Sequence, residues 1–328
     1  MNINLPFYVH LLITAVIAIA LPLILPSYVL ATEILIFALA AIGCNLLLGY
    51  TGLLSFGQAL FFGAGAYAAG LLSIHFQMGL IPTILVSIAS GVFLAVLVGF
   101  FAIRRKGIYF VMLTLAFAQL GYYIAFLAEP ITGGEDGLLD VVRPALKIPL
   151  VPTLTFDSDI SFYCLTAVVF VLTFVGMQRL VDSPLGSVLK AIKQNEERAE
   201  AIGYQVKLYK ISVFAFSGAV TALAGAFYAT MLRFAPLSNI DIETSEVILF
   251  MCVLGGLGSL YGSVFGAAIF LIATDVLAGL WPRWMLLLGL LLIVVMLYLP
   301  GGLSEAANRL IHKLRDGKTK QKKGGHHV

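Results

Sequence analysis

Ten apolar windows, each long enough to cross a lipid bilayer, follow one another along the chain. A helix crosses the hydrocarbon core with about 20 apolar residues, within a range of roughly 17–25. Only 11% of the 328 residues are charged, too few to coat a soluble protein of this size. The sequence predicts an all-α, polytopic integral membrane protein with about ten transmembrane helices (eight to ten), some of them broken or short. The windows are 7–25, 29–48, 57–75, 81–103, 108–128, 161–180, 210–232, 246–262, 263–280 and 284–300.

The eighth and ninth windows are the least regular of the ten. Residues 246–280 are barely long enough for two spans, and Gly255, Gly256, Gly258 and Gly262 interrupt them. Glycine weakens a helix because it has the most backbone freedom to lose. We therefore expect either two short helices here or one helix and a re-entrant segment.

Basic residues predict which side of the membrane each loop occupies, because short cytoplasmic loops carry an excess of Lys and Arg. With ten spans, three basic segments fall on one side, together with both termini: the cluster Arg104-Arg105-Lys106, the insert from Arg179 to Lys210 and the tail from Arg309 to Lys323. The acidic loop falls on the other side. The predicted parts are a membrane domain over 1–308, a cytoplasmic polar insert over about 182–209, an external loop over about 129–160 and a basic cytoplasmic tail over 309–328.

No combination of residues for catalysis, metal binding or nucleotide binding stands out. Cys44, Cys164 and Cys252 are widely spaced within or beside apolar runs, so we expect small buried thiols with neither a disulfide nor a metal. The phosphate-binding pattern GxxxxGK[ST] is absent from the sequence. The basic residues belong to no soluble domain that could bind nucleic acid. We expect a membrane protein that is not an enzyme, holds no cofactor and does not itself hydrolyse ATP.

The polar insert is unusual in so apolar a chain. Asp182-Ser183-Pro184 has the chemistry of a helix start, and a polar helix of about six turns is expected to follow and run directly into a membrane helix. Ala199, Ile202 and Val206 give it a small apolar stripe among mixed charges. Such a helix suits docking in the groove of a soluble partner. The alternative is a solvated cytoplasmic connector.

Two glycine-interrupted segments near opposite ends of the chain share a Gly-Leu-x-Ser core, followed by a glycine and an apolar helix. Irregular backbone at membrane depth is tolerated where it is buried in protein or lines a watery cavity. Paired segments of this kind point to a transport path, although close helix packing is an alternative and both can hold. The candidate path residues are Gly52, Ser55, Gly57, Gln58, Gly256, Ser259 and Gly262.

The insert also carries Glu197, Ala199 and Gly203 in the pattern Glu-x-Ala-x3-Gly. This pattern resembles the EAA-loop signature of ABC-importer permeases, with Arg198 standing where the consensus has alanine. Three further stretches resemble the permease subunits of branched-chain amino-acid importers, LivM type. They are GYTGLLSFGQALFFGAGAYAAG from Gly49, TGGEDGL from Thr132 and LGGLGSLYGSVFGA from Leu254.

This resemblance implies a subunit of a bacterial inner-membrane importer. A second permease of LivH type would complete the path, and an extracytoplasmic binding protein would deliver leucine, isoleucine or valine. Two cytoplasmic ATPase subunits would bind the ATP and dock on an EAA coupling helix. The coupling residues would be Glu196, Glu197, Ala199 and Gly203. The alternative substrates are urea, short amides or another amino acid, because permeases of the same lineage share these segments.

Overall fold

The computed structural model describes residues 7–146, 155–281, 283–298 and 302. Every regular element in these ranges is a helix, and one isolated antiparallel bridge joins Leu138 to Ala235. The predicted all-α class is therefore confirmed. The predicted basic tail, 309–328, lies outside the described residues, as do 147–154 of the external loop.

Six helices in the described part of the chain are long and apolar enough to cross a membrane. They are α2 (Tyr28–Thr51), α4 (Leu80–Ala102), α5 (Ile108–Leu127), α7 (Asp159–Asp182), α10 (Val206–Leu232) and α12 (Leu260–Leu280). Shorter apolar runs lie within α1 (Phe7–Ile24) and α13 (Trp284–Tyr298). The remaining elements are α3 (Gln58–His75), α6 (Glu129–Thr132), η1 (Gly134–Asp136), α8 (Pro184–Gln194), α9 (Glu196–Ala201), η2 (Leu237–Ile240) and α11 (Ile242–Gly255). The structure thus supports a polytopic membrane protein, but the count of about ten spans is not confirmed.

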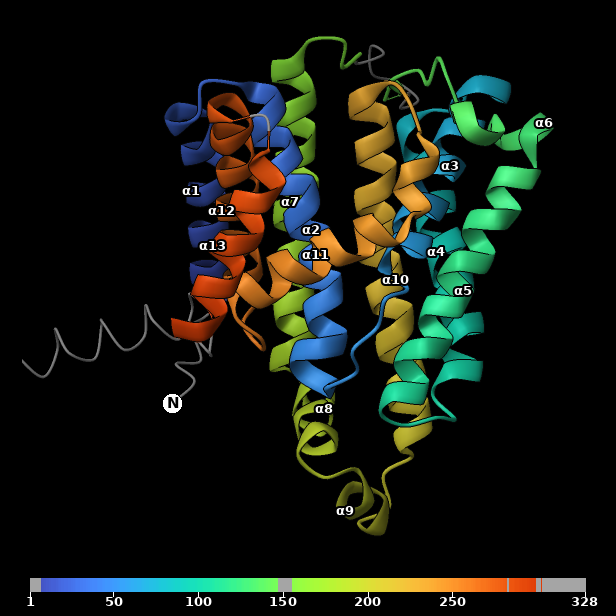
Figure 1. Ribbon diagram of the computed structural model, residues 1–328, viewed down its shortest axis with the longest axis vertical. Coiled ribbons are helices and arrows are strands. Elements are labelled where there is room, and N and C mark those ends of the chain that lie inside the picture. The colour runs from blue at the N-terminus through green and yellow to red at the C-terminus, as the bar shows by residue number, and fades with distance from the viewer. Residues whose placement is uncertain (1–6, 147–154, 282, 299–301, 303–328) are drawn as a thin grey trace, which may run out of the picture.

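Helices α2 and α10 form the centre of the bundle (Figure 1). The apolar window of α2 is 83% buried inside the protein and that of α10 is 67% buried, against 28% for α4 and 22% for α5. Glycines let α10 approach α3 (Gln58–His75) closely. A Cβ on Gly65 of α3 would lie 1.8 Å from the carbonyl oxygen of Ala222 on α10. A Cβ on Gly225 of α10 would lie 1.8 Å from the carbonyl oxygen of Phe62 on α3. Backbone-to-backbone contact of this kind is how small residues hold membrane helices together.

Helix α11 differs from the predicted eighth span. Its 14 residues extend about 21 Å at 1.5 Å per residue, short of a hydrocarbon core of about 30 Å. Figure 1 shows it lying crosswise over the bundle. The break expected between 262 and 263 falls earlier, at Gly256 and Gly258, whose φ angles of 109° and 84° no helix can contain. Ser259 then caps α12, because its hydroxyl accepts from the backbone N–H of Gly262 at 3.2 Å.

The polar insert does not form the single six-turn helix that the sequence predicts. It divides into α8 and α9, which project together from one end of the bundle (Figure 1). Asn195 causes the break: its backbone is extended, and its Oδ1 accepts from the N–H of Arg198 at 2.9 Å as the N-cap of α9. The chain turns again at Gly203, with φ at 101°, before α10 begins. The insert is thus a folded helix pair rather than an extension of α10.

Candidate functional site

The insert folds back on the start of α10 around a small apolar cluster of its own. Val188 and Ile192 of α8, Ala199 of α9 and Val206 of α10 are buried together, with Tyr209 packed against them. Ala199 is only 3% exposed. Its small side chain therefore holds α9 against α8, and it is not on the surface that a partner could touch.

Glu196, at the start of α9, lies between two lysines from different parts of the chain. Its carboxylate is 2.8 Å from Nζ of Lys210 on α10 and 3.6 Å from Nζ of Lys106 in the α4–α5 turn. The Lys210 side chain is only 5% exposed. Burial on its own would raise the pKa of Glu196, but the hydrogen bond and charge of Lys210, assisted by Lys106, lower it below its ordinary value. Glu196 thus ties the insert to the bundle.

This ion pair predicts a pH dependence of stability. Because folding lowers the pKa of Glu196, the pair contributes stability above the ordinary value of 4.5, and that contribution is lost as the pH falls through the lowered pKa. Between about pH 6 and about pH 3, we expect the melting temperature in detergent to fall further for the wild type than for Glu196→Gln. The same fall in both proteins would show that Glu196 does not contribute to the pH dependence.

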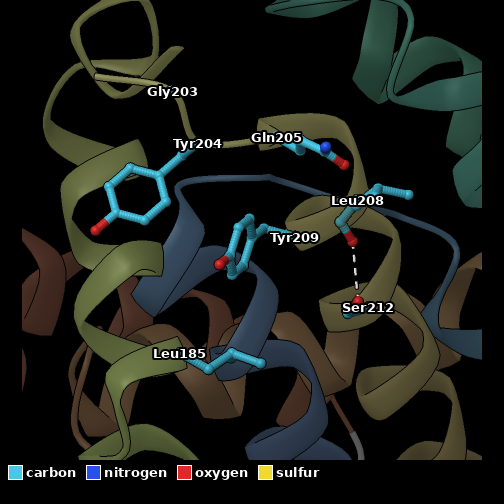
Figure 2. Close-up of a pocket in the computed structure, with 7 residues that line it drawn as sticks. All are labelled: Leu185, Gly203, Tyr204, Gln205, Leu208, Tyr209 and Ser212. Carbon is cyan, nitrogen blue, oxygen red and sulfur yellow. Dashed lines mark hydrogen bonds between the residues drawn. The ribbon is translucent and has the colours of Figure 1, made fainter. Parts of the chain in front are cut away.

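The outward surface of the insert centres on the turn between α9 and α10. A pocket of about 350 Å³ lies there, and the ring centroids of Tyr204 and Tyr209 are 6.0 Å apart beside it. Figure 2 shows these two rings close together. Ile202 is 72% exposed beside it, and Leu208 is exposed on its rim. The pocket is lined by Leu185, Gly203, Tyr204, Gln205, Leu208, Tyr209 and Ser212.

The four predicted coupling residues therefore divide into two groups. Glu197 and Gly203 are exposed, and a Cβ added to Gly203 would meet no atom within 4 Å. Glu196 and Ala199 face the protein instead. The residues of the Glu-x-Ala-x3-Gly pattern, together with Glu196, therefore do not form one contact surface. Some lie on the outer face of the folded insert and others on its inner face.

The first glycine-rich segment leads into a buried polar network. Gln58, which opens α3, donates from Nε2 to Ser217 Oγ at 3.2 Å and accepts at Oε1 from Thr221 at 2.9 Å, both on α10. Ser55 accepts from the N–H of Gly57 at 3.1 Å. Ser55, Gly57 and Gln58 are all buried. Gln58 is thus held by two hydroxyls of α10, and Ser55 by a backbone N–H of its own segment.

The second glycine-rich segment is held by Asn45 of α2, which is fully buried. Asn45 donates from Nδ2 to Ser263 Oγ at 2.6 Å and to the carbonyl of Ser259 at 2.9 Å. Its Oδ1 accepts from the N–H of Gly258 at 2.9 Å. Gly256 and Gly262 are buried, whereas Ser259 is half-buried.

Helix α11 connects the two predicted path segments. Near its start, Ser245 donates to the carbonyl of Phe56 at 2.7 Å and accepts from the N–H of Ala59 at 2.8 Å. At its end, Gly255 packs against Gly262, where an added Cβ would lie 2.5 Å from the carbonyl oxygen of Gly255. A displacement of α11 would therefore move both segments. Gly52 lies apart from this network, exposed on a cavity beside the insert.

Sequence reasoning missed the side chains that organise this network. They are Asn45, Thr114, Ser217, Thr221 and Ser245. The sequence does contain a signal for these residues, because a polar side chain within an apolar span commonly faces the bundle interior and bonds across helices.

The described residues contain no group of three or more His, Cys, Asp or Glu side chains placed to hold a metal ion. Cys44 and Cys252 are buried free thiols, as expected. Cys164 is exposed, so the expectation of burial is wrong for that residue, which lies on the outer side of α7.

Comparison with known proteins finds one family model that covers most of the chain, together with several relatives. Residues 28–297 match the family described as the permease component of branched-chain amino acid transport systems. The chain is 26% identical to the high-affinity branched-chain amino acid transport system permease protein LivM of Salmonella typhimurium, over 93% of the chain and 76% of that protein. It is also 26% identical to the LivM protein of Escherichia coli, over 89% of the chain and 72% of that protein. No solved structure shows a significant match.

Proposed function

Because the chain belongs to the family of permease components of branched-chain amino acid transport systems, we propose that it is the membrane subunit of an ATP-driven importer for leucine, isoleucine and valine. The observation that carries the proposal is the family match over residues 28–297. In this proposal a second, LivH-type permease completes the path and an extracytoplasmic binding protein delivers the solute. Two cytoplasmic ATPases bind ATP, and the complex lies in the bacterial inner membrane with both chain termini in the cytoplasm.

The insert is proposed as the element that receives the ATPase. Its position at one end of the bundle supports this role, as do the exposed Ile202, Tyr204 and Leu208 around the pocket of Figure 2. Glu197 and Gly203 would take part in that contact. Glu196 and Ala199 would act from inside, by fixing the insert to α10.

The path is proposed to run along the two glycine-rich segments. Gly52, Ser55, Gly57, Gln58, Gly256, Ser259 and Gly262 are the residues assigned to it. Alternating access requires two arrangements of the same elements. The crosswise helix α11 supports this assignment because it is bonded to one segment and packed against the other.

The decisive experiment is uptake into vesicles that contain this chain reconstituted with its second permease and both ATPases, with the binding protein added outside. We expect leucine uptake that depends on ATP and exceeds urea uptake. Urea uptake in place of leucine would reassign the solute. Leucine uptake without any ATPase would contradict the coupling.

A substitution at Gly203 tests the docking surface. We expect Gly203→Trp to remain inserted in the membrane but to lose ATPase co-purification, because a bulky ring would stand on the exposed turn. Since φ at this position is 101°, any side chain strains the backbone, and Gly203→Asn is the control for that strain. Asparagine should retain most of the ATPase. Equal loss in both variants would assign the effect to the backbone turn rather than to the surface.

A further inference from the structure

A cavity of about 470 Å³ lies where the insert meets the ends of α2, α4 and α5, apart from the pocket of Figure 2. Its floor is the backbone that leaves α2, and its walls come from the α4–α5 turn and the α8–α9 junction. Its lining includes Thr51, Gly52, Arg105, Lys106, Lys193 and Lys210, together with Glu196 and apolar residues of α5.

Cations dominate this cavity. Four basic side chains line it, and Glu196 is the one carboxylate among its lining residues. Lys106 and Lys210 already share that carboxylate. Lys193 donates to the carbonyl of Gly49 at 2.7 Å, and no acidic side chain in the described ranges forms an ion pair with Lys193 or Arg105. The surplus positive charge suits an anion with several acceptor oxygens, which lysine and the planar guanidinium both bind well.

The cavity lies beside a surface suited to lipid. Helices α4 and α5, which the basic turn joins, are the least buried of the candidate spans. Arg104, two residues beyond α4, lies over the ring of Phe100, 4.5 Å from its centroid. Phe100 and Ile108 are exposed on either side of the turn. An arginine above an exposed aromatic ring is placed where a helix leaves the hydrocarbon and enters the headgroup layer. Basic pockets between membrane helices at that depth bind anionic headgroups.

We propose that this cavity binds a phosphate group, and that the lipid-facing position of the α4–α5 turn favours the headgroup of an anionic phospholipid as its source. A soluble phosphate would offer the same chemistry. The bound group would bridge Arg105 and Lys106 of the turn to Lys193 of the insert, and so join the membrane surface to α8. The proposal does not depend on which solute the protein transports.

The test measures lipid binding to the purified, delipidated full-length protein by native mass spectrometry. Phosphatidylglycerol, phosphatidylcholine and inorganic phosphate are the probes. The cavity variant is Arg105→Gln with Lys106→Gln, both exposed side chains, and the control is Arg198→Gln with Lys207→Gln. The control residues are exposed and do not line the cavity. Their substitution removes the same two positive charges as the cavity variant does.

We expect the wild type to prefer phosphatidylglycerol to phosphatidylcholine. The cavity variant should lose affinity for phosphatidylglycerol by about 30-fold, while the control changes by less than about threefold. Phosphatidylglycerol binding that excess inorganic phosphate does not displace identifies the lipid as the source. Inorganic phosphate binding that depends on Arg105 and Lys106 identifies a soluble phosphate. Equal losses in both variants would overturn the proposal. So would the absence of both a preference for phosphatidylglycerol and any inorganic phosphate binding that depends on Arg105 and Lys106.

Discussion

Glu196→Ala is expected to destabilise the insert by about 2–3 kcal/mol, a large effect for one side chain that is not in the apolar core. The reason is Lys210, whose ammonium is 2.8 Å from this carboxylate and whose side chain is only 5% exposed. Removing one member of a buried ion pair leaves the other charged group without compensation, at a cost of about 3–5 kcal/mol. The expected value is lower because the Glu196 side chain is 24% exposed, so water can replace part of the lost interaction.

The measurement is limited trypsin digestion together with thermal unfolding in detergent. Lys193 and Arg198 are exposed but lie in helices, so trypsin cleaves there only when the insert opens locally and its backbone unfolds. The cleavage rate therefore reports local stability. Lys106→Ala is the matched control, because it removes the other cation from the same carboxylate. That lysine is 63% exposed at 3.6 Å, and such pairs contribute only about 0–1 kcal/mol.

A double variant tests the cause of the effect. Glu196→Leu with Lys210→Met removes both charges and keeps apolar bulk in their place, and such replacements are commonly neutral or stabilising. We expect it to recover most of the stability lost in Glu196→Ala. If Lys106→Ala opens the insert as much as Glu196→Ala does, the buried pair is not what holds it.

The long apolar runs predicted the spanning helices well, because length and hydropathy alone place a helix in a bilayer. Helix α4 differs from its predicted window by one residue at each end, and α5 by one residue at its end. The interruption of residues 246–280 was predicted from its glycines, but the boundary drawn between 262 and 263 was wrong, because the position of the break at Gly256 and Gly258 depends on contacts made far along the chain. Asn45 of α2 bonds the N–H of Gly258, and no local pattern could reveal that pairing.

The prediction of a single helix in the insert was wrong for a different reason. Asn195 followed by Glu196 and Glu197 is a helix-start signal with acidic residues in the first turn, but it lies inside a run of good helix formers. The stripe of Ala199, Ile202 and Val206 was therefore placed on one continuous helix. Since α9 ends at Ala201, the stripe divides: Ala199 and Val206 are buried, whereas Ile202 is 72% exposed.

The candidate path residues could be located from the sequence, but their packing could not. Gly57 and Gly262 both follow a Gly-Leu-x-Ser core, two and three residues after its serine, and both were candidate path residues. Their surroundings differ. A Cβ on Gly57 would meet the Ser55 hydroxyl at 3.3 Å and nothing nearer, whereas one on Gly262 would lie 2.5 Å from the backbone carbonyl oxygen of Gly255.

Gly262→Ala is therefore expected to lower folding stability by about 1–3 kcal/mol, because the backbone of α11 must move away from α12 to admit one methyl group. Gly57→Ala should leave the melting temperature close to that of the wild type, because a serine side chain can yield by a few tenths of an ångström. Thermal unfolding of both variants and the yield of complex assembled with the second permease are the measurements. Gly176→Ala on α7 is the control, since an added Cβ there would meet no atom within 4 Å.

The same pair of variants separates packing from transport. Uptake per assembled complex should fall for Gly57→Ala if the segment from Gly52 to Gln58 must rearrange during transport, because an alanine restricts the backbone that glycine leaves free. For Gly262→Ala, lost uptake should follow lost assembly, since its clash is with the resting structure. Wild-type stability in Gly262→Ala would show that α11 and α12 separate without cost at this contact. Helix α11 could not then transmit motion between the two segments through it.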